Sequence, residues 1–203
     1  EGLVDYLSER KISVFGPNRF AAQLEGSKAF MKNLCKKNNI PTANFGIFDN
    51  FDEASHFIKK NRSPIVVKAD GLASGKGVSI CSSIEEALKK TKEILNGKFK
   101  SSKKVILEEF LDGEELSYFL IIDENSYCFF GSAQDHKRVG EGDTGPNTGG
   151  MGAYSPAPLL NKKLEDKIKK KIIEPTINAM KKLGYPYKGF LYAGLMIKKE
   201  EPY

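Results

Sequence analysis

The segment from Val66 to Ile80, VVKADGLASGKGVSI, places a glycine-rich loop between two apolar, β-branched runs. A phosphate-binding P-loop has the pattern G-x-x-x-x-G-K-[ST] and leads into a helix. Here Gly71 and Gly75 are one residue too close, and Gly77 stands where a serine or threonine should follow Lys76. Gly77 also begins another strand pattern rather than a helix. The sequence therefore predicts a strand-to-strand turn, suited to closing over an anion rather than cradling it from beneath.

Patterns on both sides of this turn predict an α+β fold. The predicted helices are residues 27–39, 52–61, 82–95 and 164–183. The predicted strands are residues 64–68, 77–81, 127–135 and 189–199, with two more inside 103–123. Asp112-Gly113 supplies turn chemistry within that last segment, so its two strands and the strand after them are expected to be antiparallel. Antiparallel strands with crossing helices favour an α+β unit over a parallel, doubly wound sheet.

Single residues refine these helices. Ser83 and Glu86 form a capping box at the start of one helix, and Pro175 should bend the longest one. Lys28 lies in the first turn of another helix, where the helix dipole mildly disfavours a cation. Its ammonium is therefore expected either to point to solvent or to reach an anion.

Composition narrows the class of protein. The formal net charge is +6, but the basic runs are interleaved with acidic residues or lie in predicted loops, and no nucleic-acid motif accompanies them. No apolar run approaches the roughly 18 residues of a membrane span. We expect a cytoplasmic protein without nucleic-acid or membrane partners. Cys35, Cys81 and Cys128 are expected to be buried free thiols.

Two segments carry candidate binding chemistry. Lys68 ends a predicted strand and faces the glycine loop, whose backbone N–H groups and Lys76 could hold anionic oxygens. The segment EEFLDGEELS could offer backbone groups to an adenine edge, with Glu115 accepting from ribose hydroxyls. Each segment also fits a plain β-hairpin with a solvated turn. His136 could touch an anionic substrate or simply end a basic strand in solvent.

The order of four blocks adds a resemblance. Lys28, VVKADGLASGKG, EEFLDGEELS and GDTGPNTGGMGAYSP stand in the order typical of the ATP-grasp superfamily, and the chain resembles that superfamily over nearly its whole length. The last block, which is aperiodic from Arg138 to Pro158, is similar to the glycinamide ribonucleotide synthetase (phosphoribosylamine–glycine ligase) family. The first three blocks are shared by many ATP-grasp ligases, whereas GPNTGGMGAYSP is specific to this branch.

The resemblance implies an ATP-grasp fold of two α+β subdomains that clasp ATP. Residues 1–24, with a predicted helix near Leu3 and a strand at Ile12–Phe15, would be the end of an α/β N-terminal domain. Residues 25–203 would be the ATP-grasp domain, truncated at its C-terminal end, with a lid over about 62–125. The resemblance implies that the chain would be a central fragment lacking both ends of the enzyme.

The resemblance also implies site residues. Lys28 and Lys68 would contact the ATP phosphates and serve as the catalytic residues, and the loop would close over them. The nucleotide-binding set would be Lys28, Lys68, Gly71, Ser74, Gly75, Lys76, Gly77, Glu108, Glu109, Phe110, Leu111 and Glu115. The substrate-binding set would be Asp143, Asn147, Thr148, Gly149, Gly150 and Met151. No metal ligand is assigned within the chain, since the Mg²⁺ ligands are expected beyond Tyr203.

The implied function is ATP-dependent ligation of glycine to 5-phosphoribosylamine through a glycyl phosphate, in purine biosynthesis. Such chemistry needs charge neutralisation rather than a protein nucleophile. The alternatives are another ATP-grasp carboxylate–amine ligase and a non-catalytic ATP-binding fragment. The fragment alone is expected to be inactive.

Overall fold

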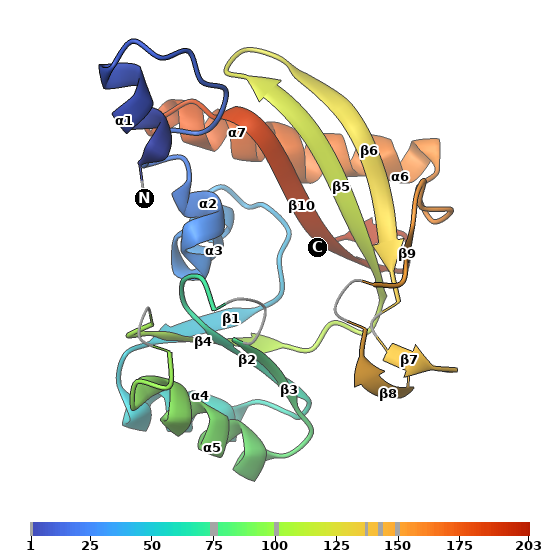
Figure 1. The fold of residues 1–203 in the computed structure, drawn as a ribbon. Coiled ribbons are helices and arrows are strands. Elements are labelled where there is room, and N and C mark those ends of the chain that lie inside the picture. Colours follow the sequence, from blue (N-terminus) through green and yellow to red (C-terminus); the bar gives the residue numbers. More distant parts are fainter. Residues whose placement is uncertain (1, 74–76, 100–101, 137, 142–143, 149–150) are drawn as a thin grey trace. The chain divides into compact units, whose positions relative to one another are not determined.

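A computed structural model of the chain describes residues 2–73, 77–99, 102–136, 138–141, 144–148 and 151–203 (Figure 1). The chain divides into two compact units, which are residues 22–111 and residues 1–21 together with 112–203. The predicted boundary after residue 24 and the predicted lid over 62–125 remain predictions. Every strand pairing among the described residues is antiparallel, as the α+β interpretation requires.

The unit of residues 22–111 contains a four-stranded sheet of order β1-β4-β2-β3. Its strands are β1 (Phe45–Phe48), β2 (Ile65–Ala69), β3 (Val78–Cys81) and β4 (Val105–Glu109). Its helices are α2 (Gln23–Gly26), α3 (Lys28–Lys37), α4 (Phe51–Lys60) and α5 (Ile84–Leu95). The sequence missed β1, a strand of only four half-buried residues that is defined by its pairing with β4.

The two faces of this sheet differ in chemistry. Side chains alternate between faces along a strand, so Ile65 and Val67 of β2 share one face with Leu107 of β4. This face belongs to one buried cluster with residues of α4 and α5, the two helices that cover it in Figure 1. The opposite face carries Lys68 and Glu108. The apolar core therefore fixes the register that brings two charged side chains to one face.

Local sequence sets the helix ends. Helix α3 ends at Lys37, and Asn38 and Asn39 follow it, the latter with a φ of 53°, as the predicted stop signal requires. Helix α5 begins after Ser83, whose hydroxyl accepts a hydrogen bond from the backbone N–H of Glu86. The carboxylate of Glu86 accepts in return from the N–H of Ser82 rather than from that of Ser83 itself.

The other unit is built on a five-stranded sheet of order β11-β10-β5-β6-β9, with β7 and β8 paired separately. Its strands are β5 (Glu114–Asp123), β6 (Tyr127–Asp135), β7 (Arg138–Gly140), β8 (Thr144–Asn147), β9 (Ala153–Tyr154), β10 (Lys188–Lys198) and β11 (Glu201–Pro202). Its helical segments are α1 (Leu3–Glu9), α6 (Lys162–Ile168), a π-helical turn (Lys169–Ile173) and α7 (Glu174–Lys182). Alternate residues of β5 are buried, and α6 and α7 run along one face of this sheet (Figure 1).

Four expectations need correction. Ile12–Phe15 is not a strand, because no described strand pairs with it. The segment from Arg138 to Pro158 contains β7, β8 and β9, which are too short to leave a periodic pattern. Cys128 is exposed, whereas Cys35 and Cys81 are buried free thiols. The two strands joined through Asp112-Gly113 are not an antiparallel pair, because β4 belongs to the four-stranded sheet and β5 to the five-stranded one. The bend at Pro175 stays a prediction, and this residue follows a π-helical turn.

Among the described residues, no helix combines the length and the apolar character that crossing a membrane would need.

Candidate functional site

The glycine loop connects two paired strands. Strand β2 pairs antiparallel with β3, with Lys68 opposite Val78, and the N–H of Ala69 donates to the carbonyl of Gly77 at 2.7 Å. Gly71 has a φ of 77°, a left-handed conformation that favours glycine. A Cβ on Gly77 would lie 2.6 Å from that of Ala73, so a side chain there would force the loop to shift. The loop is a strand-to-strand turn, as predicted.

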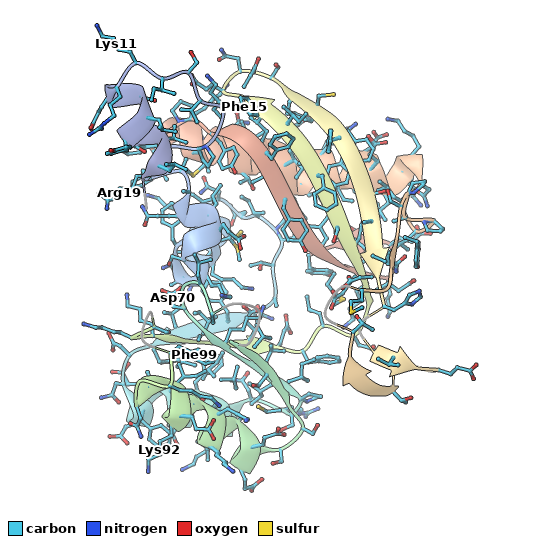
Figure 2. The ribbon with its side chains drawn as sticks, viewed as in Figure 1. Lys11, Phe15, Arg19, Asp70, Lys92 and Phe99 are labelled. Carbon is cyan, nitrogen blue, oxygen red and sulfur yellow. The ribbon has the colours of Figure 1, made fainter. Side chains whose placement is uncertain are left out.

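Helix α3 is tied to the start of this loop through Asp70. The Asp70 carboxylate accepts a hydrogen bond from the N–H of Ala29 at 3.1 Å and from the hydroxyl of Ser27 at 3.2 Å. Ser27 in turn caps the helix by accepting from the N–H of Phe30. Figure 2 shows Asp70 at the end of β2, next to the first turn of α3. One carboxylate therefore joins the N-terminus of α3 to the end of β2.

The same junction fixes Lys28. Its ammonium donates to the carbonyl of Gly71 at 2.9 Å. Gly71 directly follows Asp70, so this is a second contact between the start of α3 and the end of β2. The sequence left solvent and an anion as alternatives for this side chain. In the structure the ammonium lies against the backbone of the glycine loop, so two lysines, Lys28 and Lys68, flank the place where the loop begins.

Lys68 belongs to a group of three charges, of which Glu108 and Lys32 are buried. Val66 lies opposite Glu108 in the register of β2 and β4, so Lys68 is the diagonal neighbour of Glu108 on the same face. The Lys68 ammonium lies 2.9 Å from Glu108 Oε2, and the Lys32 ammonium of α3 lies 3.1 Å from the same oxygen. The Glu108 side chain is only 5% exposed. Two lysines and one carboxylate leave one net positive charge on this face.

The three side chains are unequally satisfied. Lys32 is buried and also donates to Thr42 Oγ1 at 2.7 Å and to the carbonyl of Ala43 at 3.4 Å. Burial lowers the pKa of the Lys32 ammonium, and the attraction of Glu108 opposes that shift. Glu108 Oε1 is buried and has no hydrogen-bond partner among the described residues. A buried acceptor without a donor costs free energy, so a ligand that donates a hydrogen bond fits here.

The residues after Glu108 lie at the end of the same unit. Glu109 ends β4, and its carboxylate accepts from the N–H of Asn44 at 2.8 Å while its own N–H donates to the Asn44 carbonyl at 3.0 Å. Phe110 is partly exposed and Leu111 follows it. Glu115 lies in the other unit, in β5, opposite Met196 of β10.

The predicted substrate-binding residues also belong to that second unit. The Thr148 hydroxyl donates to the carbonyl of His136, whose N–H donates to the carbonyl of Gly152 at 2.8 Å. Asn147 ends β8, and Met151 is 94% exposed. The His136 ring lies next to that of Tyr154, with centroids 5.3 Å apart.

Several predicted site residues lie outside the described part of the chain: Ser74, Gly75, Lys76, Asp143, Gly149 and Gly150. Among the predicted residues of the unit 22–111, the structure brings Lys28, Lys68 and Gly71 to the start of one loop and Glu108 to Lys68. Sequence reasoning missed Lys32 and Asp70. The signal for Lys32 was its place four residues after Lys28, on the same side of the helix, next to an apolar stripe.

The fold and these residues define an ATP-grasp protein. The structure is similar to that of the D-alanine–D-alanine ligase from Bacillus anthracis, with a TM-score of 0.71 over 100% of this chain and 62% of that one. At 19% identity, this similarity concerns the fold alone.

A protein-family model described as "Phosphoribosylglycinamide synthetase, ATP-grasp (A) domain" matches residues 26–203, and the chain belongs to that family. It is 51% identical to a phosphoribosylamine–glycine ligase from Brucella melitensis, over 99% of the chain and 47% of that protein. It is 52% identical to the chloroplastic phosphoribosylamine–glycine ligase of Arabidopsis thaliana, over 98% of the chain and 38% of that protein.

A crystal structure of phosphoribosylamine–glycine ligase from Thermotoga maritima has a TM-score of 0.88 and 40% identity, over 100% of this chain and 52% of that one. The chain thus spans about half the length, or less, of these relatives.

Proposed function

We propose that the protein to which this chain belongs is an ATP-dependent ligase that joins glycine to 5-phosphoribosylamine through a glycyl phosphate, a step of purine biosynthesis. Family membership and relatives of about 50% identity that bear this name support the proposal. The observation that carries it is structural: Lys28 and Lys68 flank the start of one glycine loop, where a polyphosphate needs positive charge.

The arrangement suits phosphoryl transfer, in which the protein mostly positions groups and neutralises charge. Bound ATP would supply the phosphoryl group that activates the glycine carboxylate. Lys28 and Lys68 would neutralise phosphate oxygens. Backbone N–H groups of the loop from Gly71 to Gly77 would donate further hydrogen bonds to the same phosphates. The loop would also keep water away from the reacting atoms.

Adenine recognition fits the end of β4. The buried Glu108 Oε1 lacks a partner among the described residues and could accept a hydrogen bond from the exocyclic amine of adenine. Backbone groups of Glu108 to Leu111 would form hydrogen bonds with the rest of the adenine edge. Glu115 would accept hydrogen bonds from the ribose hydroxyls. Asp143, Asn147, Thr148, Gly149, Gly150 and Met151 would hold glycine or phosphoribosylamine.

Magnesium belongs to the same proposal, and no ligand for it is assigned within this chain. Among the described residues no group of three or more His, Cys, Asp or Glu side chains could hold a metal ion, so no step is assigned to a metal here. The substrates are small polar molecules, and we expect the reaction in the cytoplasm without a nucleic-acid or membrane partner.

Measuring ADP release by the full-length protein tests the proposal. Release should depend on both glycine and 5-phosphoribosylamine, and other amino acids should not replace glycine. ADP release without any dependence on glycine would overturn the assignment and favour another ATP-grasp ligase.

The chain by itself supports a narrower function, ATP binding without turnover, because it spans only about half of its relatives. Calorimetry of the 203-residue chain with ATP, with and without Mg²⁺, should detect binding. Turnover of ATP by this chain in the presence of both substrates would contradict that narrower function.

A further inference from the structure

Lys32 is a buried cation that the mechanism above does not use. Its side chain is 3% exposed, and burying an ammonium is costly unless every donor is paired. Its N–H groups meet Glu108 Oε2, Thr42 Oγ1 and the Ala43 carbonyl, so the ammonium has an acceptor for each of its donors. Its ammonium also lies 5.3 Å from the centre of the Phe45 ring. Lys32 is therefore held entirely within the protein and has no donor left for a ligand.

Lys68 shares the same carboxylate but is held differently. Its side chain is 26% exposed, and its one described hydrogen bond goes to Glu108 Oε2 at 2.9 Å. Lysine has three N–H donors, so the described part of the chain leaves Lys68 with donors that can reach a ligand. The exposure and the donor count agree that Lys68, and not Lys32, faces the binding site.

The charges explain why both lysines are needed. If Glu108 had Lys68 as its only cation, the pair would be neutral, and Glu108 would compete with any phosphate oxygen for the Lys68 ammonium. With Lys32 on the same oxygen, Glu108 is already neutralised from inside the unit. The remaining positive charge then resides on the exposed partner, where an anion can use it.

We propose that Lys32 is a positioning residue for nucleotide binding: it is the buried counter-ion of Glu108, and so it leaves the charge of Lys68 available to a phosphate group. This inference rests on the proposed function, in which Lys68 contacts the phosphates of ATP. Lys32 does not touch the nucleotide, and it acts through Glu108.

The test compares ATP with adenosine, which lacks phosphates, by calorimetry on the full-length protein. Lys32→Gln keeps a hydrogen-bonding side chain but removes the charge. It should weaken ATP binding about tenfold, the low end for a charged hydrogen bond, and change adenosine binding less than about threefold. Lys32→Arg keeps the charge and should restore most of the ATP affinity. Lys36→Met removes an exposed lysine one turn further along the same side of the helix; it is the matched control and should bind ATP normally.

The double variant Lys32→Gln/Glu108→Gln isolates the role of charge. In the Glu108→Gln background there is no carboxylate to neutralise, so adding Lys32→Gln should change ATP affinity less than about threefold. The proposal would be overturned if Lys32→Gln bound ATP with unchanged affinity. It would also be overturned if Lys32→Gln lowered ATP affinity equally with and without the Glu108 carboxylate, or lowered adenosine affinity as much as ATP affinity. If Lys32→Gln alone fails to fold by thermal unfolding, the double variant, which leaves no buried ion unpaired, still decides the question by comparison with the wild type. The ratio of its ATP affinity to its adenosine affinity should stay within about threefold of the wild-type ratio, and a ratio about tenfold lower would overturn the proposal.

Lys68→Ala separates this inference from the proposed function. Unchanged ATP affinity in Lys68→Ala would refute the phosphate assignment itself. A loss in Lys68→Ala together with normal binding in Lys32→Gln would refute the role of Lys32 and leave the proposed function intact.

Discussion

Glu201 and Glu108 are two of the described carboxylates that each lie between two lysines, and they differ in burial. Glu201 of β11 meets Lys167 through Oε1 and Lys171 through Oε2, each at 2.6 Å, with all three side chains at least partly exposed. Glu108 is 5% exposed and meets both its lysines through Oε2 alone. The exposed carboxylate uses both oxygens, whereas the buried one keeps an oxygen without a described partner.

This difference in burial distinguishes the surface ion pairs of Glu201 from the candidate binding site at Glu108. Water screens the exposed group, so its ion pairs join α6 and the π-helical turn to β11 with little effect on stability. Glu108 and Lys32 are 5% and 3% exposed and have little such screening, so each missing partner there costs free energy. In that setting an oxygen without a described partner and a lysine with spare donors can both bind a ligand, whereas both carboxylate oxygens of Glu201 are already paired.

Removing each carboxylate should give the largest contrast. Glu108→Ala leaves the buried Lys32 ammonium without its counter-ion and should lower the local free energy of unfolding of β2 and β4 by about 3 kcal/mol. Hydrogen–deuterium exchange of these strands in the full-length protein measures that change. Glu201→Ala is the matched control, and a comparable loss of protection in its own strand would contradict the role of burial.

Removing one lysine from each group should separate binding from stability. Lys68→Ala still leaves Glu108 paired with Lys32, so the fold should persist while the affinity for ATP falls tenfold or more. Lys171→Ala makes the same change in the exposed group and should not alter ATP affinity. Calorimetry with ATP checks both variants, and normal affinity in Lys68→Ala would rule out its contact with phosphate.

Asp70 extends the comparison to a carboxylate that forms no ion pair with a lysine among the described residues. Asp70→Ala removes the acceptor for the N–H of Ala29 and the hydroxyl of Ser27, and should destabilise the start of α3 by about 1 kcal/mol. ATP affinity should fall severalfold as well, because Lys28 loses its fixed place beside the loop. Asp70→Asn keeps an acceptor oxygen and should be milder in both hydrogen exchange and calorimetry. Equal effects of the two variants would show that the charge, not the cap, matters.

Local patterns predicted much of this architecture. The turn after β2, the start of α5 at Ser83 and the end of α3 near Asn38 depend on neighbouring residues, and each is in its predicted place. The family followed from the order of motifs, which local sequence also records. Short elements escaped prediction, as β7, β8 and β9 did, because two to four residues show no period.

The missed parts of the site depend on contacts between distant segments. Lys32 looked like one of many lysines on an amphipathic helix, and nothing near it in the sequence indicates that Glu108 of β4 will meet it. Asp70 looked like part of a turn, and its role depends on α3. The same limit explains Cys128, which lies in a strand pattern but on a side of β6 that stays exposed.

The smallest expected effect is a pH dependence at the exposed group. The hydrogen bonds from Lys167 and Lys171 lower the pKa of Glu201 from 4.5 to about 2. For an acid whose pKa is lower in the folded state, the stabilisation is complete above pH 4.5 and is lost as the pH falls toward 2. Thermal unfolding should therefore show that the full-length wild type loses slightly more stability between pH 5 and pH 3 than the Glu201→Gln variant does. Lys171→Gln should remove part of this difference, and identical pH profiles for the wild type and Glu201→Gln would show that water screens the group completely.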